Sequence, residues 1–210
     1  MDKQRMETYL DILREELVPA MGCTEPIAIA YAAALARDTL GAMPERTVLT
    51  VSGNIVKNVK SVVVPNTGGR KGMRSAVAAG LCFGKAAREL EVIAEAKPED
   101  LSAMDAWLET AVIEIREAES DLPFDLAVEL IKGAESAYVH IVSHHTNVVC
   151  IRKNGETLLE KPWYCSVGMN RYVAAIIDTL NRGQSLQEII RPARRIKEMV
   201  ALYRGKDGGQ

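Results

Sequence analysis

The stretch GCTEPIAIAYAAALA, residues 22–36, decides how the rest of the chain must be arranged. The next charged residue after Glu25 is Arg37, so a helix over this stretch would be apolar on every side. A helix of that kind is usually buried, and the stretch therefore predicts a central helix surrounded by other elements. Thr24 is expected to cap this helix, which should end near residues 39–40, just before Gly41.

Periodic segments flank the apolar stretch on both sides. Before it, apolar residues at helical spacing predict an amphipathic helix over residues 4–18. After it, β-branched residues predict two strands, at 47–52 and 59–64. The remaining elements expected before residue 120 are a glycine-rich turn and two helices, at residues 67–72, 73–90 and 98–118.

After Pro123 the apolar period changes from helical to alternating. Asn154-Gly155 favours a type I′ hairpin between the last two of four expected strands. This order predicts an α+β fold, with a mostly antiparallel or mixed sheet packed with helices, one apolar buried helix and a helical C-terminal extension. The strands are expected at residues 126–131, 137–143, 148–152 and 157–160, and the later helices at 169–181 and 185–203.

Composition is that of an ordinary globular protein. The chain has 210 residues, of which 48% are hydrophobic and 26% charged, and its formal net charge is -2. We expect one α+β domain over residues 1–165, a helical extension over 166–204 and a disordered tail over 205–210.

The sequence also indicates where the protein is expected in the cell and which partners are not expected. No apolar run approaches the roughly 18 residues of a membrane-spanning helix, and the N-terminus does not resemble a signal peptide. The four cysteines are too widely spaced for a disulfide scaffold or a CxxC zinc site, so a cytoplasmic setting is expected. The basic C-terminal segment lacks interleaved aromatic residues, which argues against nucleic acid as a partner.

Cys23 and Glu25 lie where the apolar helix should begin, and they are the first candidates for chemistry. A helix N-terminus favours anions, so the pKa of the Cys23 thiol should be lowered, and a thiolate there could attack or bind a metal. If the start of the helix is buried, the pKa of Glu25 should be raised, which suits a general base. The alternatives are a small buried hydrophobe at Cys23 and a surface acid at Glu25.

Three further polar segments are candidates, each with a solvated turn as the alternative. Asn54, Lys57 and Asn58 lie between the first two expected strands. The glycine-rich turn at residues 67–72 could present backbone N–H groups to a carboxylate or phosphate. His144 and His145, between two later strands, could titrate near neutrality or bind a metal.

Taken in order, these segments resemble the N-terminal half of the L-cysteine desulfidase family, an iron–sulfur family related to the bacterial L-serine dehydratases. The motifs that carry the resemblance are Gly22-Cys23-Thr24-Glu25-Pro26, Ser52-Gly53-Asn54 with Lys57-Asn58, Val64-Pro65-Asn66-Thr67-Gly68 and His145-Thr146-Asn147. The first of them is the most specific. The resemblance covers residues 8–155, and residues after 165 match poorly.

The resemblance implies a pyridoxal-independent α,β-elimination. L-cysteine or L-serine, a small amino-acid substrate, would give pyruvate and ammonia, with sulfide released from cysteine. The cofactor implied is an oxygen-sensitive 4Fe-4S cluster, with Cys23 as a metal ligand or near neighbour of the cluster. Family members are about twice as long, so the other cluster cysteines are expected outside this chain, on a C-terminal catalytic half or a partner subunit.

The resemblance and the chemistry together assign roles to the candidate residues. Glu25 or His145 would remove the α-proton, and Lys57 would stabilise developing charge. The substrate-binding residues expected are Thr24, Asn54, Asn58, Thr67, Gly68, Gly69 and Asn147. Two other functions stay open: a non-catalytic module that binds amino acids and regulates, and a structural dimerisation domain, since a homo-oligomer is also compatible with the apolar helix.

Overall fold

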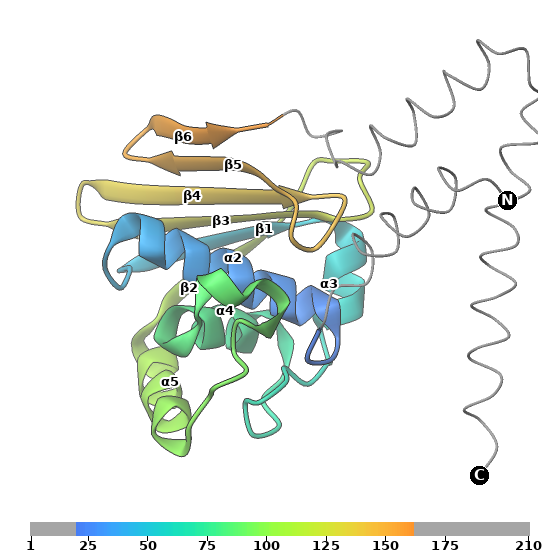
Figure 1. Cartoon of the computed structure of the whole chain (residues 1–210), viewed down its shortest axis with the longest axis vertical. Helices are drawn as coiled ribbons and strands as arrows, with labels where there is room; N and C mark the ends of the chain where they lie inside the picture. The colour runs from blue at the N-terminus through green and yellow to red at the C-terminus, as the bar shows by residue number, and fades with distance from the viewer. Residues whose placement is uncertain (1–19, 162–210) are drawn as a thin grey trace, which may run out of the picture. The chain divides into compact units, whose positions relative to one another are not determined.

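The computed structural model describes residues 20–161, and those residues form an α+β fold around one mixed sheet, as predicted. The six strands follow the order β2-β1-β3-β4-β5-β6, and the main group of helices lies against one face (Figure 1). Strand β1 runs parallel to β2 and antiparallel to β3, and every later pairing is antiparallel. The strands are β1 (Arg46–Val51), β2 (Val112–Glu117), β3 (Asp125–Lys132), β4 (Glu135–Val142), β5 (Val148–Lys153) and β6 (Glu156–Glu160).

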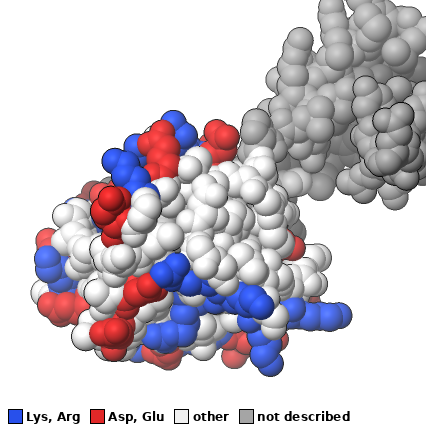
Figure 2. All heavy atoms as spheres, turned by 90° about the horizontal axis from the view of Figure 1, so that it is seen from below, with Lys and Arg blue, Asp and Glu red and all other residues white. Residues whose placement is uncertain are grey.

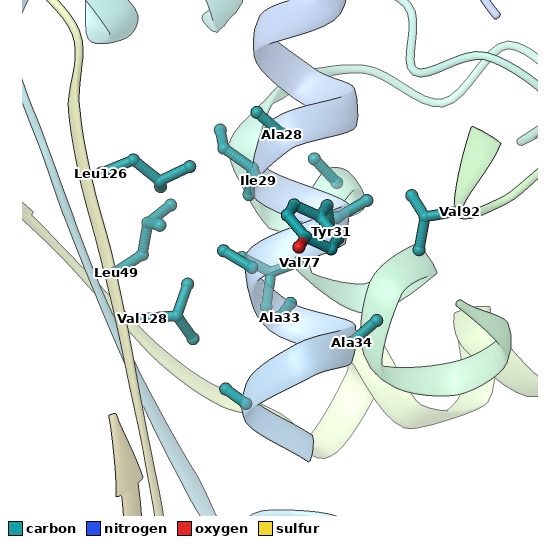
Figure 3. Close-up of a cluster of buried hydrophobic side chains, with 14 of the residues drawn as sticks. Ala28, Ile29, Tyr31, Ala33, Ala34, Leu49, Val77, Val92, Leu126 and Val128 are labelled. Carbon is teal, nitrogen blue, oxygen red and sulfur yellow. The ribbon is translucent and has the colours of Figure 1, made fainter. Parts of the chain in front are cut away.

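Helix α2 (Thr24–Leu40) is the apolar helix that the sequence predicted, and it is buried along almost its whole length. Figure 3 shows why no side of it carries a charge: Ile29 faces Leu49 and Leu126 of the sheet, while Ala34 lies on the side of Val92. Because the helix lies between the sheet and a second helical layer, a polar residue on either side would lose its water.

The outer layer is built from α4 (Gly72–Phe83), the 3-10 helix η1 (Ala86–Glu91) and α5 (Pro98–Thr110). Helix α4 packs unusually close to α2, since a Cβ at Gly80 would overlap the carbonyl group of Ala30. Arg37 of α2 then donates hydrogen bonds to the backbone oxygens of Leu81 (2.9 Å) and Gly84 (2.8 Å). A cation at those carbonyls stabilises the C-terminal end of α4.

Both ends of α2 test the predicted boundaries. Gly41 follows the helix in the left-handed region (φ 83°), as expected for a helix that ends there. At the other end Cys23 occupies the N-cap position and makes no side-chain capping bond. The expectation that Thr24 caps the helix is therefore wrong by one residue, because Thr24 already has helical geometry.

The strand expected at residues 59–64 is wrong. The chain forms helix α3 (Gly53–Val59) directly after β1, and only Val63 makes an isolated bridge, to Lys71. Of the residues expected in that strand only Val59 is helical, because it shares the buried face of α3 with Ile55, four residues earlier.

The helix expected at residues 98–118 is also wrong in its second half. Helix α5 ends at Thr110 and residues 112–117 form β2, which pairs with the outer edge of β1. The apolar residues of 98–118 fit one face of a helix, but the free edge of β1 can be paired only by an extended segment. Val112, Ile113 and Ile115 are β-branched, which favours such a segment. The helix expected at 73–90 is likewise shorter, since Gly84 ends α4 and η1 follows.

From residue 125 onward the predictions are confirmed. All four later strands form within two residues of the expected bounds. Asn154 and Gly155 both have positive φ, at 51° and 82°, as a type I′ hairpin requires. The helix expected at 4–18, the extension at 166–204 and the tail at 205–210 lie outside the described residues.

Charges are spread over the described surface in local pairs. Arg46 and Arg116 both bind Glu114, and Lys85 binds Glu95. On the face shown in Figure 2, basic and acidic side chains alternate around a broad area that carries neither. Side chains of both signs thus lie near this uncharged area of the described surface.

Candidate functional site

The first turn of α2 carries a carboxylate that collects hydrogen bonds from two segments of the chain. Glu25 Oε2 accepts from the Cys23 thiol (3.2 Å) and, more weakly, from the Thr24 hydroxyl (3.5 Å). Its other oxygen, Oε1, accepts from Asn58 Nδ2 of α3 (3.3 Å). The first two motifs of the sequence therefore meet at one group.

Helix α3 explains why Asn58 reaches the carboxylate. Asn54, Lys57 and Asn58 were expected in a connection between strands, but at helical spacing they share the exposed face of α3. The buried face, with Ile55 and Val59, anchors this helix to the core. The three polar side chains are therefore presented together on a rigid element.

His145 is the third contributor, from the connection between β4 and β5. Its ring lies against Phe124, with ring centroids 4.6 Å apart and planes inclined at 59°. The carboxylate of Glu25 and the His145 imidazole are close enough to shift each other's pKa. Asn58 thus contacts the Glu25 carboxylate, and His145, although distant in sequence, lies within range of its charge.

The protonation states differ from those expected. Partial burial tends to raise the pKa of Glu25, but hydrogen bonds from Cys23 and Asn58 and the field of His145 outweigh it, so this pKa is lowered, not raised. Burial and the hydrogen bond to Glu25 raise the pKa of the Cys23 thiol, where the helix N-terminus was expected to lower it. Glu25 is therefore ionised at neutral pH and Cys23 is a thiol.

The start of α2 is also less buried than the sequence suggested. Cys23 is exposed, and Glu25 is only half-buried. The apolar run predicted burial correctly from Pro26 onward, but the two residues with chemistry lie just outside the core. His145 is half-buried, and this burial, together with His144, lowers its pKa against the opposing effect of Glu25. Its imidazole is neutral at neutral pH.

The glycine-rich turn uses its threonine side chain for its own structure. The Thr67 hydroxyl is buried and donates to the Val64 carbonyl (2.7 Å), so it is already occupied. Arg70 binds the Thr67 carbonyl and forms an ion pair with Asp105 of α5.

Gly68 and Gly69 are exposed and have positive φ. A Cβ at Gly68 would meet Arg70 and Leu101, so the turn packs toward α5. A Cβ at Gly22, next to Cys23, would lie 3.0 Å from Pro65 Cγ, so the segment that leads into this turn lies against the start of α2.

Asn147 is the last expected substrate contact. Its side-chain amide donates to the Val142 carbonyl (3.0 Å) and so stabilises its own loop. Asn54 and Lys57 are exposed on α3 beside Asn58. The structure thus brings together Cys23, Thr24, Glu25, Asn58 and His145, and it gives Thr67 and Asn147 structural hydrogen bonds.

The described residues do not by themselves fit an iron–sulfur cluster, which commonly needs several thiolates. Cys23 is exposed at the site, but Cys82 is half-buried on α4, where burial raises its pKa to about 11. Cys150 is buried on β5 in a separate small cluster with Val142 and Val149. Across residues 20–161, no three acidic, histidine or cysteine side chains are grouped as metal ligands.

Sequence reasoning missed two features near the site. Phe124, which holds the His145 ring, precedes β3 and gives no linear signal of that contact. Asp125 Oδ1 and His140 Nε2 are 2.8 Å apart on neighbouring strands. Strand alternation could have placed Asp125 and His140 on one face, since antiparallel pairing aligns their strands.

None of the helices described is long and apolar enough to span a membrane.

Comparison with known proteins finds relatives named UPF0597 proteins. The chain is 50% identical over 152 residues to one from Desulfitobacterium hafniense, a match that covers 72% of this chain and 35% of that protein. It is 40% identical over 163 residues to one from Treponema denticola (78% and 38%) and 42% identical over 152 residues to one from Lachnoclostridium phytofermentans (72% and 36%).

The chain therefore spans little more than a third of the length of these relatives. No protein-family model matches the chain. No solved structure matches it either.

Proposed function

We propose that this chain is the N-terminal part, or one subunit, of a cytoplasmic iron–sulfur-dependent lyase that eliminates from L-cysteine or L-serine to give pyruvate and ammonia. The observation that supports the proposal is the meeting of three resembling motifs at the Glu25 carboxylate, through Cys23, Asn58 and His145. Such a meeting of separate polar segments is common at catalytic sites.

His145 is the better candidate for the general base. Its pKa is lowered by burial, so the imidazole is neutral and can accept a proton at neutral pH. The pKa of Glu25 is lowered as well, which makes this carboxylate a weak base. In the proposed reaction Glu25 instead stabilises the imidazolium that forms when His145 accepts the proton.

The elimination then proceeds from the α-carbon. His145 removes the α-proton, the electron pair forms the Cα–Cβ double bond, and the Cβ–S or Cβ–O bond breaks to release sulfide or hydroxide. The resulting enamine takes a proton at Cβ to become an imine. Water adds to the imine, and ammonia leaves to give pyruvate.

Substrate binding is assigned to the exposed face of α3. The amides of Asn54 and Asn58 and the ammonium group of Lys57 can hold the substrate carboxylate and stabilise the charge that develops when the proton leaves. Thr24 contributes a hydroxyl beside Glu25. The exposed backbone of Gly68 and Gly69 is a second group proposed to hold the substrate carboxylate, because Pro65 of the same motif lies against Gly22 at the start of α2.

The iron–sulfur cluster is part of the proposal through the resemblance alone. Such a cluster would activate the leaving group, but the described residues bring only the Cys23 thiol to the site. Its other ligands are assigned to a C-terminal half or partner subunit, in keeping with the greater length of the relatives. No step above is derived through the cluster.

Glu25→Gln tests the proposal in the complete protein, with its partner part present and reconstituted anaerobically with iron and sulfide. Pyruvate formation from L-cysteine and L-serine should fall by about 100-fold or more, because the neutral amide cannot stabilise imidazolium at His145. Glu99→Gln, an exposed acid in the first turn of α5, is the matched control and should leave the rate unchanged. Equal rates for both variants, or no pyruvate from the unsubstituted protein, would contradict the proposal.

The alternative is a non-catalytic module that binds an amino acid and regulates. It is favoured by the exposed donors on α3 together with the single thiol at the site. A thermal-shift measurement on the chain alone separates the two. Stabilisation by L-cysteine or L-serine without any elimination by the complete protein would support the regulatory module.

A further inference from the structure

The loop between β4 and β5 is folded tightly around His145. The His144 N–H donates to the Val142 carbonyl (2.7 Å), the Asn147 N–H donates to the His144 carbonyl (3.1 Å), and the Val142 N–H donates to the Asn147 carbonyl (3.2 Å). Ser143 takes a left-handed conformation (φ 66°), which is uncommon for a residue with a side chain. The loop therefore has one defined backbone conformation.

The Asn147 side chain adds a further bond to this loop. Its amide donates to the same Val142 carbonyl (3.0 Å), so this donor closes the loop at its base. The amide lies two residues after His145 in sequence and is committed to the backbone. This contact explains the asparagine in the His145-Thr146-Asn147 motif without any substrate.

Phe124 ties the same loop to the core. Its carbonyl accepts from the Ser143 N–H (2.9 Å), and its side chain, buried in the main hydrophobic cluster, lies against the His145 ring. A ring held at 4.6 Å and tilted by 59° restricts how the imidazole can turn. One residue therefore fixes both the loop backbone and the imidazole.

We propose that Phe124 and Asn147 are positioning residues that hold the His145 imidazole beside Glu25. This inference rests on the proposed function only where it treats His145 as the base, and it moves Asn147 from the substrate contacts to the support of that base. Packing and hydrogen bonds that hold a base in one orientation increase the fraction of molecules in which it can reach the substrate proton.

The charged groups that act on His145 come from two elements. Glu25 of α2 raises the pKa of His145, and His144 of the same loop lowers it. Burial is the largest influence and lowers the pKa. Removing the Phe124 ring should therefore let water in and move the His145 pKa upward, toward its ordinary value of 6.5.

The test is a proton NMR titration of the histidine ring signals in the full 210-residue chain. Phe124→Leu keeps an apolar side chain but removes the ring, so the ring-current shift of His145 should disappear and its pKa should rise. Phe124→Tyr keeps the ring and should preserve both. His144 and His140 in the same spectra report any general change.

Asn147→Ala is a second test variant. Its side chain lies at a half-buried loop position, so the substitution should leave the chain folded. The His145 signals should move toward those of the exposed His144 as the loop loosens. Asn66→Ala is the matched control, because its amide also donates to backbone carbonyls, of Ile93 and Ala94, but in another loop. It should leave His145 unchanged.

Two results would overturn the positioning role. One is an unchanged His145 shift and pKa in both Phe124→Leu and Asn147→Ala, and the other is an equal change in Asn66→Ala. Because no turnover is measured, the outcome is independent of the elimination assay. A chain whose His145 responds as expected but which eliminates nothing when complete would contradict the proposed function and leave the positioning intact.

Discussion

Thr47 shows at the scale of one residue how the core can hold a polar group without a partner. Its hydroxyl is buried on β1, and no hydrogen-bond partner for it is present in the described part of the chain. Its neighbours on the same face, Leu49 and Val51, belong to the hydrophobic core. A buried unpaired hydroxyl costs stability that a methyl group of similar shape would not.

Thr47→Val should therefore stabilise the protein by about 1 kcal/mol, since it replaces the unpaired hydroxyl with a methyl group. Urea unfolding would measure the difference. Thr50→Val on the same strand, where the side chain is half-buried on the other face, is the control and should change little. A loss of stability at Thr47 would mean that the hydroxyl has a partner.

Asp125 predicts a dependence of stability on pH. The hydrogen bond from His140 holds the pKa of Asp125 below its ordinary value of 3.8, against the opposing effect of burial. The ionised form therefore favours the folded state. Its contribution is present above that ordinary value and is lost as pH falls through the lower pKa of the folded protein.

Asp125→Asn should remove that part of the acid dependence. Unfolding free energies measured between about pH 2 and pH 5 should fall less steeply with acid than in the unsubstituted chain. Asp121→Asn, an exposed loop position, is the control. Identical acid profiles for the two variants would remove Asp125 from the acid response.

At the scale of elements, the contact between α2 and α4 depends on the absence of a side chain. A Cβ at Gly80 would collide with the Ala30 carbonyl, and one at Gly84 would lie 2.9 Å from the Ala34 Cβ. Backbone atoms in two packed helices cannot move aside as the end of a side chain can. The small residues of both helices thus set how close they approach.

Gly80→Ala should destabilise the protein by about 1–3 kcal/mol, because the helices must separate. Thermal or urea unfolding would show it. Gly53→Ala on α3 is the matched control, since its Cβ would meet only the movable end of Glu117, and its effect should be small. Equal stability of Gly80→Ala and the parent chain would show that α4 can shift freely.

The elements also show which predictions could be made locally. The strands after residue 125 alternate cleanly and are joined by a hairpin with its own turn signal, so the sequence predicted them. Residues 59–64 and 112–117 both carry β-branched and apolar residues, but only 112–117 form a strand. Their conformation followed from burial against α2 and from the free edge of β1, neither of which is visible in a local window.

At the scale of the described molecule, the sheet and the outer helices protect α2 from both sides. Helix α2 contacts β3, β4, α4 and η1, whereas β2 and β6 form the edges of the sheet. Local opening should therefore cost most at α2 and least at the edges. The arrangement predicts an order of amide exchange.

Hydrogen exchange followed by mass spectrometry should find the slowest exchange in α2 and β3 and faster exchange in β6. Comparing β5 with β6 gives an internal control, because both belong to one hairpin but only β5 is paired on both sides. Exchange in α2 as fast as in β6 would show that the central helix is not the stable centre of this fold.

The residues of the candidate site could be predicted from the sequence, but not all of their properties. Cys23, Glu25, Asn58 and His145 stand out as motif residues, and the structure brings them together. The pKa shifts of Cys23 and Glu25 were predicted in the wrong direction, because they depend on burial and on hydrogen bonds that form only in the folded chain. The role of Phe124 could not be predicted, since its contact with His145 exists only after β3 and β4 have paired.

Local sequence patterns were enough to predict the buried helix, the strands from residue 125 onward and the α+β class, because hydrophobic period and turn residues act over a few neighbours. Tertiary structure alone decided that residues 53–59 form a helix and 112–117 an edge strand, and that Glu25 is ionised beside a protonated thiol. Those outcomes depend on burial and on partners brought together by folding, which no local pattern of residues specifies.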